Sequence, residues 1–233
     1  MAEGEFAADL MARAVERPLA KHHAASAQEV RHLLGAAYAV IERTGSLDLT
    51  MRELLHEAGM SNQAFYRHFG SKDDLFIAIL DHGRRRMAEL LRERMSRADG
   101  PLAAVRAWVD GVLAQAADPR LAARTRPFVA HVDRLATRFP EAHRASERAM
   151  IEPLMDALRA ATADGSLPGP GGRADPERDA RTVYLLTVAS LHDHLMAGTP
   201  PTPSQVDHLF AFVSGGLRGT AGSDSPADRP EQG

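Results

Sequence analysis

The twelve residues from Ser61 to Lys72 combine hydroxyl, amide, aromatic and basic side chains in a pattern suited to a polyanion. No acidic residue occurs in this stretch, and its two formal charges, Arg67 and Lys72, are both positive. Asparagine and glutamine can form paired hydrogen bonds with adenine. Tyrosine, histidine and lysine can bind phosphates. The stretch therefore predicts contacts with base edges and with the phosphate backbone of a nucleic acid.

Two short helices joined by a tight turn are expected to position these residues. Thr50 begins the first helix, because Thr50 and Glu53 match a capping box. Gly59 ends it, since glycine suits the left-handed backbone of such a turn. Ser61 then begins a second helix, expected to run to Phe69. A short helix, a glycine turn and a second short helix are the layout of a helix-turn-helix, whose second helix enters the major groove of DNA.

The segment from residue 27 to about residue 80 resembles the DNA-binding domain of TetR-family transcriptional repressors. The residues that carry the resemblance are Thr50, Leu54-Leu55, Ala58-Gly59-Met60-Ser61, Phe65-Tyr66-Arg67-His68-Phe69, Ser71-Lys72 and Leu75. The resemblance implies three DNA-binding helices, a divergent all-helical ligand-binding domain and a homodimer. It also implies that Tyr66, His68 and Lys72 hold phosphates.

The expected DNA contacts combine this resemblance with the chemistry of the side chains. Ser61, Asn62 and Gln63 begin the second helix of the motif, where side chains reach base edges. The hydroxyl group and backbone N–H groups at Thr50 could bind a phosphate at a helix N-terminus. The complete expected set is Thr50, Ser61, Asn62, Gln63, Tyr66, Arg67, His68 and Lys72.

Two features depart from the family pattern. About 25 residues precede the first helix, and position 64 is alanine, which offers only a methyl group, such as one that could meet a thymine methyl. Lys21-His22-His23 could form a basic arm in the minor groove. A floppy leader is the alternative interpretation.

Composition favours an all-α fold. Alanine, leucine, arginine and glutamate are abundant, β-branched residues are sparse, and aromatic residues make up 5%. We expect an N-terminal three-helix DNA-binding domain joined to a larger all-helical domain. The expected divisions are a flexible or marginally helical leader over 1–25, the DNA-binding domain over 26–83 with the helix-turn-helix at about 50–69, the effector-binding and dimerisation domain over 84–218, and a disordered tail over 219–233.

The larger domain is expected to contain six further helices that proline and glycine punctuate. Their expected ranges are about 101–117, 119–125, 127–138, 141–163, 176–197 and 203–218. The helix over 176–197 is apolar nearly all round, and Gly215-Gly216 in the last helix would allow close approach of another helix. These two helices and their symmetry mates would form a four-helix dimer interface, as the resemblance implies. A monomeric core is the alternative.

A small-molecule effector is expected to bind among the helices from 101 to 197. The candidate pocket residues are Trp108, Phe128, His131, His143, Met150, Tyr184, Thr187 and His192. Seven arginines and three acidic residues lie between Arg120 and Arg148, which would suit a hydrophobic or anionic ligand such as an acyl thioester or a carboxylate. A solvated basic face is the alternative interpretation of that run.

Several classes of protein are disfavoured by composition. The chain has no cysteine, which excludes disulfides, thiolate nucleophiles and cysteine-ligated metals. No apolar run approaches the length of a membrane span, and the first residues lack a signal pattern, so we expect a cytoplasmic protein without a membrane partner. The net charge of −3 means that DNA binding must come from a local patch. We expect no cofactor and no metal.

These observations predict a ligand-responsive transcriptional regulator, not an enzyme. It would bind a palindromic operator as a homodimer, act as a repressor, and leave the DNA when an effector binds. The alternatives are a helical small-molecule-binding protein and a metal-dependent enzyme that uses the region of His192 and His194. His192 and His194 are two residues apart, and residues at that spacing on a helix do not share a face, which argues against a metal ion bound by both.

Overall fold

A computed structural model describes residues 25–167 and 175–219 of the chain. The described residues are largely helical and contain no strand, which confirms the predicted all-α class. The expectations for the leader, the basic arm at Lys21-His22-His23 and the tail beyond residue 219 lie outside the described residues. The chain divides into two compact units between Phe76 and Ile77, whereas the sequence led us to expect a boundary after residue 83. The helix that crosses this boundary has no break in its sequence to mark it.

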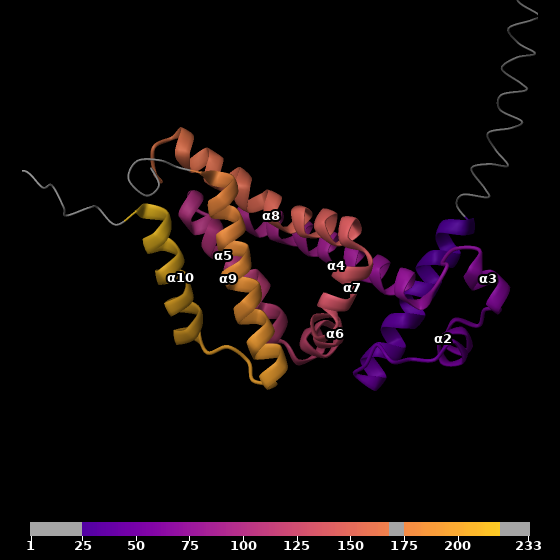
Figure 1. The fold of residues 1–233 in the computed structure, drawn as a ribbon. Helices are drawn as coiled ribbons and strands as arrows, with labels where there is room; N and C mark the ends of the chain where they lie inside the picture. Colours follow the sequence, from indigo (N-terminus) through magenta and orange to yellow (C-terminus); the bar gives the residue numbers. More distant parts are fainter. Residues whose placement is uncertain (1–24, 168–174, 220–233) are drawn as a thin grey trace, which may run out of the picture. The chain divides into compact units, whose positions relative to one another are not determined.

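The first unit contains a helix over 25–44, α2 (Met51–Ala58), α3 (Asn62–Tyr66) and the first turn of α4 (Lys72–Met95) (Figure 1). Its core is built from apolar side chains of every one of these elements. The fully buried members include Leu33, Ile41, Leu54, Phe65 and Leu75. Phe65 anchors α3 in this core, and its ring centroid lies 5.6 Å from that of Phe69.

Local capping interactions set the ends of α2 and α3. The Thr50 hydroxyl accepts from the backbone N–H of Glu53 at 3.1 Å, and the Glu53 carboxylate accepts from the backbone N–H of Thr50 at 2.7 Å. This pair is the predicted capping box. Gly59 has φ 59° and ψ 31°, the left-handed conformation expected for the turn. The Ser61 hydroxyl accepts from the backbone N–H of Ala64 at 3.2 Å and caps α3.

The second helix of the motif is shorter than predicted. It ends at Tyr66 instead of Phe69. The backbone N–H groups of His68 and Phe69 both donate to the carbonyl of Phe65, at 2.9 and 3.0 Å. This tight turn replaces a further helical turn and lets Phe69 join Phe65 in the core.

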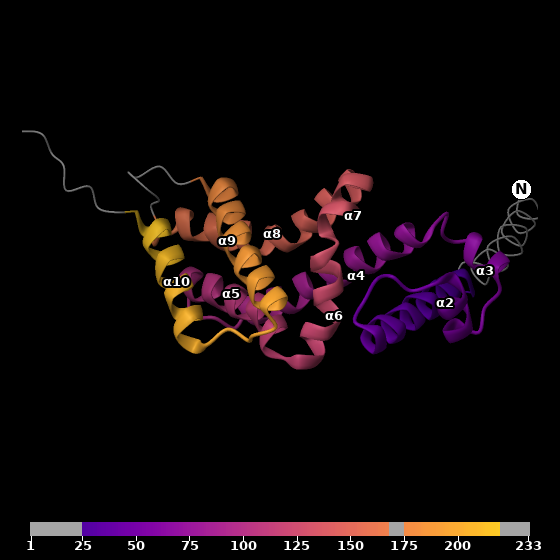
Figure 2. The same cartoon turned by 60° about the horizontal axis from the view of Figure 1, so that its bottom comes forward.

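The second unit contains the rest of α4 and six more helices within the described residues. These are α5 (Pro101–Ala117), α6 (Pro119–Ala130), α7 (Val132–Arg138), α8 (Pro140–Ala163), α9 (Pro176–Ala197) and α10 (Pro203–Arg218). Helix α5 is central to this unit, because it contacts α6, α8, α9 and α10. Helix α10 lies beside α9 in both Figure 1 and Figure 2.

The prediction that Pro127 separates two helices is wrong. Helix α6 continues through Pro127 to Ala130, and the break comes at His131. A proline inside a helix removes one backbone hydrogen bond. Pro127 and Phe128 are both buried, so side-chain packing offsets this loss.

Candidate nucleic-acid interface

Helix α3 presents a polar face to solvent while its opposite face is buried. Ser61, Asn62 and Gln63 are exposed at the start of the helix, and Tyr66 is 58% exposed at its end. Phe65, between them in sequence, is 0% exposed. The Tyr66 ring packs edge-on against Phe65, with the ring centroids 5.2 Å apart. The core therefore fixes the helix, and the polar side chains remain available to a partner.

The Thr50 hydroxyl, expected to meet a phosphate, forms capping bonds within its own unit. It donates to the Glu53 carboxylate at 2.8 Å as well as accepting from the Glu53 N–H. The backbone N–H and the hydroxyl of Thr50 lower the pKa of the Glu53 carboxyl. Both polar groups of Thr50 are thus used to cap α2.

Arg67 and His68 also have partners inside the unit. The guanidinium of Arg67 donates to the Glu29 carboxylate at 3.0 and 3.2 Å, and Nε2 of His68 lies 2.7 Å from Glu29 Oε2. The His68 side chain is 11% exposed, so most of its surface is not accessible to a phosphate. The hydrogen bond from His68, followed by the charge of Arg67, lowers the pKa of the Glu29 carboxyl.

Lys72 likewise points into its own unit. Its ammonium group donates to the carbonyl of Leu49 at 2.8 Å, and the residue is half-buried. This bond ties the start of α4 to the chain just before α2. Arg67, His68 and Lys72 thus each bind a partner within the unit. The uncharged members of the expected set on α3 and at its start, Ser61, Asn62, Gln63 and Tyr66, are all exposed.

In the second unit, three of the expected effector-pocket residues lie together. The indole N–H of Trp108 donates to the carbonyl of Met150 at 3.2 Å, and the ring centroids of Trp108 and Tyr184 are 6.3 Å apart. All three residues are buried. They fill the core between α5, α8 and α9.

The other expected pocket residues are dispersed. Phe128 and Thr187 are buried, and the Thr187 hydroxyl donates to the carbonyl of Val183 at 2.8 Å. Nδ1 of His131 lies 2.9 Å from the carbonyl of Pro127. His192 is exposed on α9, which argues against a place in an interior pocket.

His143 belongs to a polar network that joins α4, α8 and α9. The guanidinium of Arg84 donates to Nδ1 of His143 at 3.3 Å and to the buried Ser146 hydroxyl at 2.9 Å. Because Nδ1 accepts, Nε2 carries the ring proton, and it lies 3.4 Å from the Glu147 carboxylate. The Tyr184 hydroxyl also donates to Glu147, at 3.4 Å.

Two groups of this network have shifted pKa values. Burial raises the pKa of Tyr184 to about 12, and the hydrogen bond from His143 lowers the pKa of Glu147. Arg84, Ser146 and Glu147 are not among the residues that the sequence predicts for a site. One signal was present, since Arg84 falls four residues before Ala88 on the buried stripe of α4.

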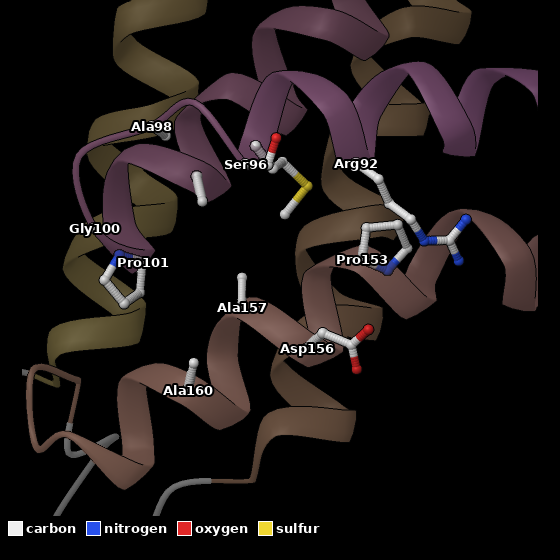
Figure 3. A pocket seen from close by; sticks show the side chains of 11 residues that line it. Arg92, Ser96, Ala98, Gly100, Pro101, Pro153, Asp156, Ala157 and Ala160 are labelled. Carbon is white, nitrogen blue, oxygen red and sulfur yellow. The ribbon is translucent and has the colours of Figure 1, made fainter.

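A hollow of about 330 Å³ opens on the surface of the second unit (Figure 3). Small and apolar side chains line most of it, including Ala98 and Pro101 on one side and Ala157 and Ala160 of α8 on the other. Arg92 and Asp156 lie at its other end. None of the expected pocket residues lines this hollow.

The alternative that uses histidines as metal ligands gains no support from their placement. Nδ1 of His194 lies 3.1 Å from the carbonyl of Thr199, and His192 faces solvent. Over residues 25–167 and 175–219, no three metal-ligating side chains cluster. Within the same ranges, no helix has the length and apolar character to span a bilayer.

Comparison with known proteins places this geometry in a family. Residues 33–79 match the family model for bacterial regulatory proteins of the tetR family. Over 71 residues the chain is 37% identical to the HTH-type transcriptional regulator BetI of Brucella anthropi. The chain therefore carries a tetR-family domain over these residues. The BetI alignment covers 30% of this chain and 37% of BetI, so the chain spans about a third of the length of that relative.

Solved structures of similar fold extend the comparison beyond the tetR-family domain. The fatty acid degradation regulator FadR of Bacillus halodurans superposes with a TM-score of 0.64 at 18% identity, covering 82% of this chain and 97% of FadR. FadR of Bacillus subtilis, solved with stearoyl-CoA, gives 0.64 at 14% identity, covering 80% of this chain and 98% of that protein. These likenesses show the fold of both units. BetI is a transcriptional regulator, which agrees with the class that the sequence predicts.

Proposed function

We propose that the chain is a DNA-binding transcriptional regulator whose helix α3 reads the major groove. The observation that supports this most strongly is the outward polar face of Asn62, Gln63 and Tyr66, held in place by the buried Phe65. Asn and Gln side chains recognise bases, and a Tyr hydroxyl binds phosphate. The proposed target is a palindromic operator and the proposed action is repression, as the resemblance to tetR-family repressors implies.

DNA that flanks the chain's own coding region is the first target to test. Saturable binding with a symmetric footprint, weakened by salt and by Tyr66→Ala, would support the proposal. The proposal would be contradicted if the folded protein preferred none of these fragments over random DNA at any salt concentration from low to moderate.

Replacing Gln63 should change which operator is preferred. Gln63→Ala removes an exposed amide from the start of α3, and one lost paired contact reduces discrimination at that base by about 1–3 kcal/mol per half-site. Selection from a randomised operator library measures the preference. Gln28→Ala, the same substitution at an exposed position of the helix over 25–44, is the control and should leave the selected sequence unchanged.

We further propose a homodimer formed through α9 and α10. Large apolar side chains remain exposed on both helices: Leu185 and Met196 on α9, and Phe212, 68% exposed, on α10. A second copy of the same surface would bury them in an isologous interface. A dimer would also present two α3 helices to half-sites about 34–36 Å apart or a multiple of that distance.

Phe212→Ala should weaken this dimer by about a hundredfold or more. Each copy would lose the burial of one phenylalanine, about 1.5–3 kcal/mol, and an isologous interface contains the residue twice. Sedimentation as a function of concentration gives the dimer constant. Leu121→Ala removes a partly exposed apolar side chain from α6 and is the matched control. Equal dimer constants for both variants would show that α10 is not in the interface.

The proposed effector is a hydrophobic anion bound in the second unit. The support is that FadR of Bacillus subtilis, which has a similar fold, was solved with stearoyl-CoA. Release of operator DNA by a long-chain acyl-CoA, but not by CoA alone, is the test. Unchanged DNA binding at saturating acyl-CoA would exclude this class of effector.

A further inference from the structure

Glu29 connects the first helix of the DNA-binding unit to the end of α3. It lies on the helix over 25–44, and its partners Arg67 and His68 are 38 and 39 residues further along the chain. Both partners follow Tyr66 directly, where α3 ends. One carboxylate therefore spans from the first helix to the two residues that terminate α3.

The two partners differ in how far they are exposed. The His68 side chain is 11% exposed, and its Nε2 lies 2.7 Å from Glu29 Oε2. The Arg67 side chain is 57% exposed, and its guanidinium lies 3.0 Å from the same oxygen. The His68 bond is the more shielded from solvent, so it contributes more to holding the end of α3 in place. In the Arg67 ion pair, the Glu29 carboxylate offsets the positive charge that lies next to the polar face of α3.

We propose that Glu29 is a positioning residue for DNA recognition. This inference rests on the proposed function of α3. Through His68 the carboxylate sets the orientation of the exposed Asn62, Gln63 and Tyr66. Through Arg67 it neutralises a cation that would otherwise attract any phosphate backbone. Glu29 therefore favours the operator over unrelated DNA.

Two substitutions separate positioning from charge. Glu29→Gln removes the negative charge and keeps the size of the side chain. Glu29→Asp keeps the charge and withdraws the carboxylate by one methylene, which lengthens a 2.7 Å contact. Glu57→Gln is the control for loss of one negative charge, because Glu57 of α2 lies in the same unit and pairs with Arg43 at 3.9 Å.

The measurement is the ratio of affinities for the operator and for unrelated DNA of equal length, at two salt concentrations, with the full chain. Glu29→Gln and Glu29→Asp are both expected to lower this ratio about tenfold, the size of one lost charge-assisted hydrogen bond. Glu57→Gln should shift both affinities by a similar factor and leave the ratio unchanged.

Three results would overturn the inference. The ratio could stay at its wild-type value in Glu29→Asp, which would reduce the role of Glu29 to its charge. Glu29→Gln could match Glu57→Gln. Both Glu29 variants could lose the folded first unit by circular dichroism, which would make the carboxylate an element of stability. A wild-type protein that does not distinguish the operator from unrelated DNA would instead contradict the proposed function itself.

Discussion

Phe65→Ala is expected to destabilise the DNA-binding unit by about 3–5 kcal/mol, the usual cost of removing a buried phenylalanine ring. Phe65 is 0% exposed and contacts the rings of Tyr66 and Phe69. No other residue of α3 is buried, since the rest of this short helix is exposed or half-buried. The variant should therefore lose both the fold of this unit and its affinity for DNA. Chemical denaturation followed by far-ultraviolet circular dichroism measures the loss.

Tyr66→Ala is the matched control, because it removes the neighbouring aromatic ring from the exposed side of the same helix. Its unfolding free energy should change by much less than that of Phe65→Ala, whereas its DNA affinity should still fall. Equal destabilisation by the two variants would contradict the assignment of one ring to the core and the other to the interface.

Trp108→Ala should have a comparable effect on the second unit. Trp108 is 0% exposed at the centre of α5, its ring lies tilted against that of Tyr184, and its indole N–H donates to the carbonyl of Met150. Removing a buried tryptophan costs about 3–5 kcal/mol. Because Trp108 is the one tryptophan of the chain, circular dichroism and not tryptophan fluorescence must follow the transition.

The control for Trp108→Ala is Leu121→Ala on α6, whose side chain is partly exposed. Leu121→Ala should lower the unfolding free energy by much less than Trp108→Ala does. A loss below about 1 kcal/mol for Trp108→Ala would mean that the ring lines a space that other side chains can fill, as an effector-pocket role would suggest.

Features set by neighbouring residues could be predicted from the sequence. The Thr50–Glu53 capping box and the left-handed Gly59 depend on residues within a few positions of each other, and both are present. These local rules were sufficient to predict where each helix of the motif begins and the turn between them.

Features that depend on distant partners could not be predicted. The intramolecular partners of the basic residues are one example, because Lys72 donates to the carbonyl of Leu49 and Arg67 pairs with Glu29. Nothing in the sequence relates Glu29 to residues 38 positions away. The pocket residues pose the same difficulty, because an apolar side chain such as Trp108 can fill a core or line a cavity.

The absence of cysteine allows the proposed role of α3 to be tested directly at one position. A single cysteine introduced as Gln63→Cys can carry a DNA-cleaving iron chelate, and Leu121→Cys on α6 can carry the same chelate as the control. We predict that the chelate at position 63 cuts the operator at two symmetric clusters, one within each half-site, well above the cutting from position 121. Cutting from position 63 that is no stronger than from position 121, under conditions where both labelled proteins bind the operator, would contradict the proposal that α3 reads the DNA.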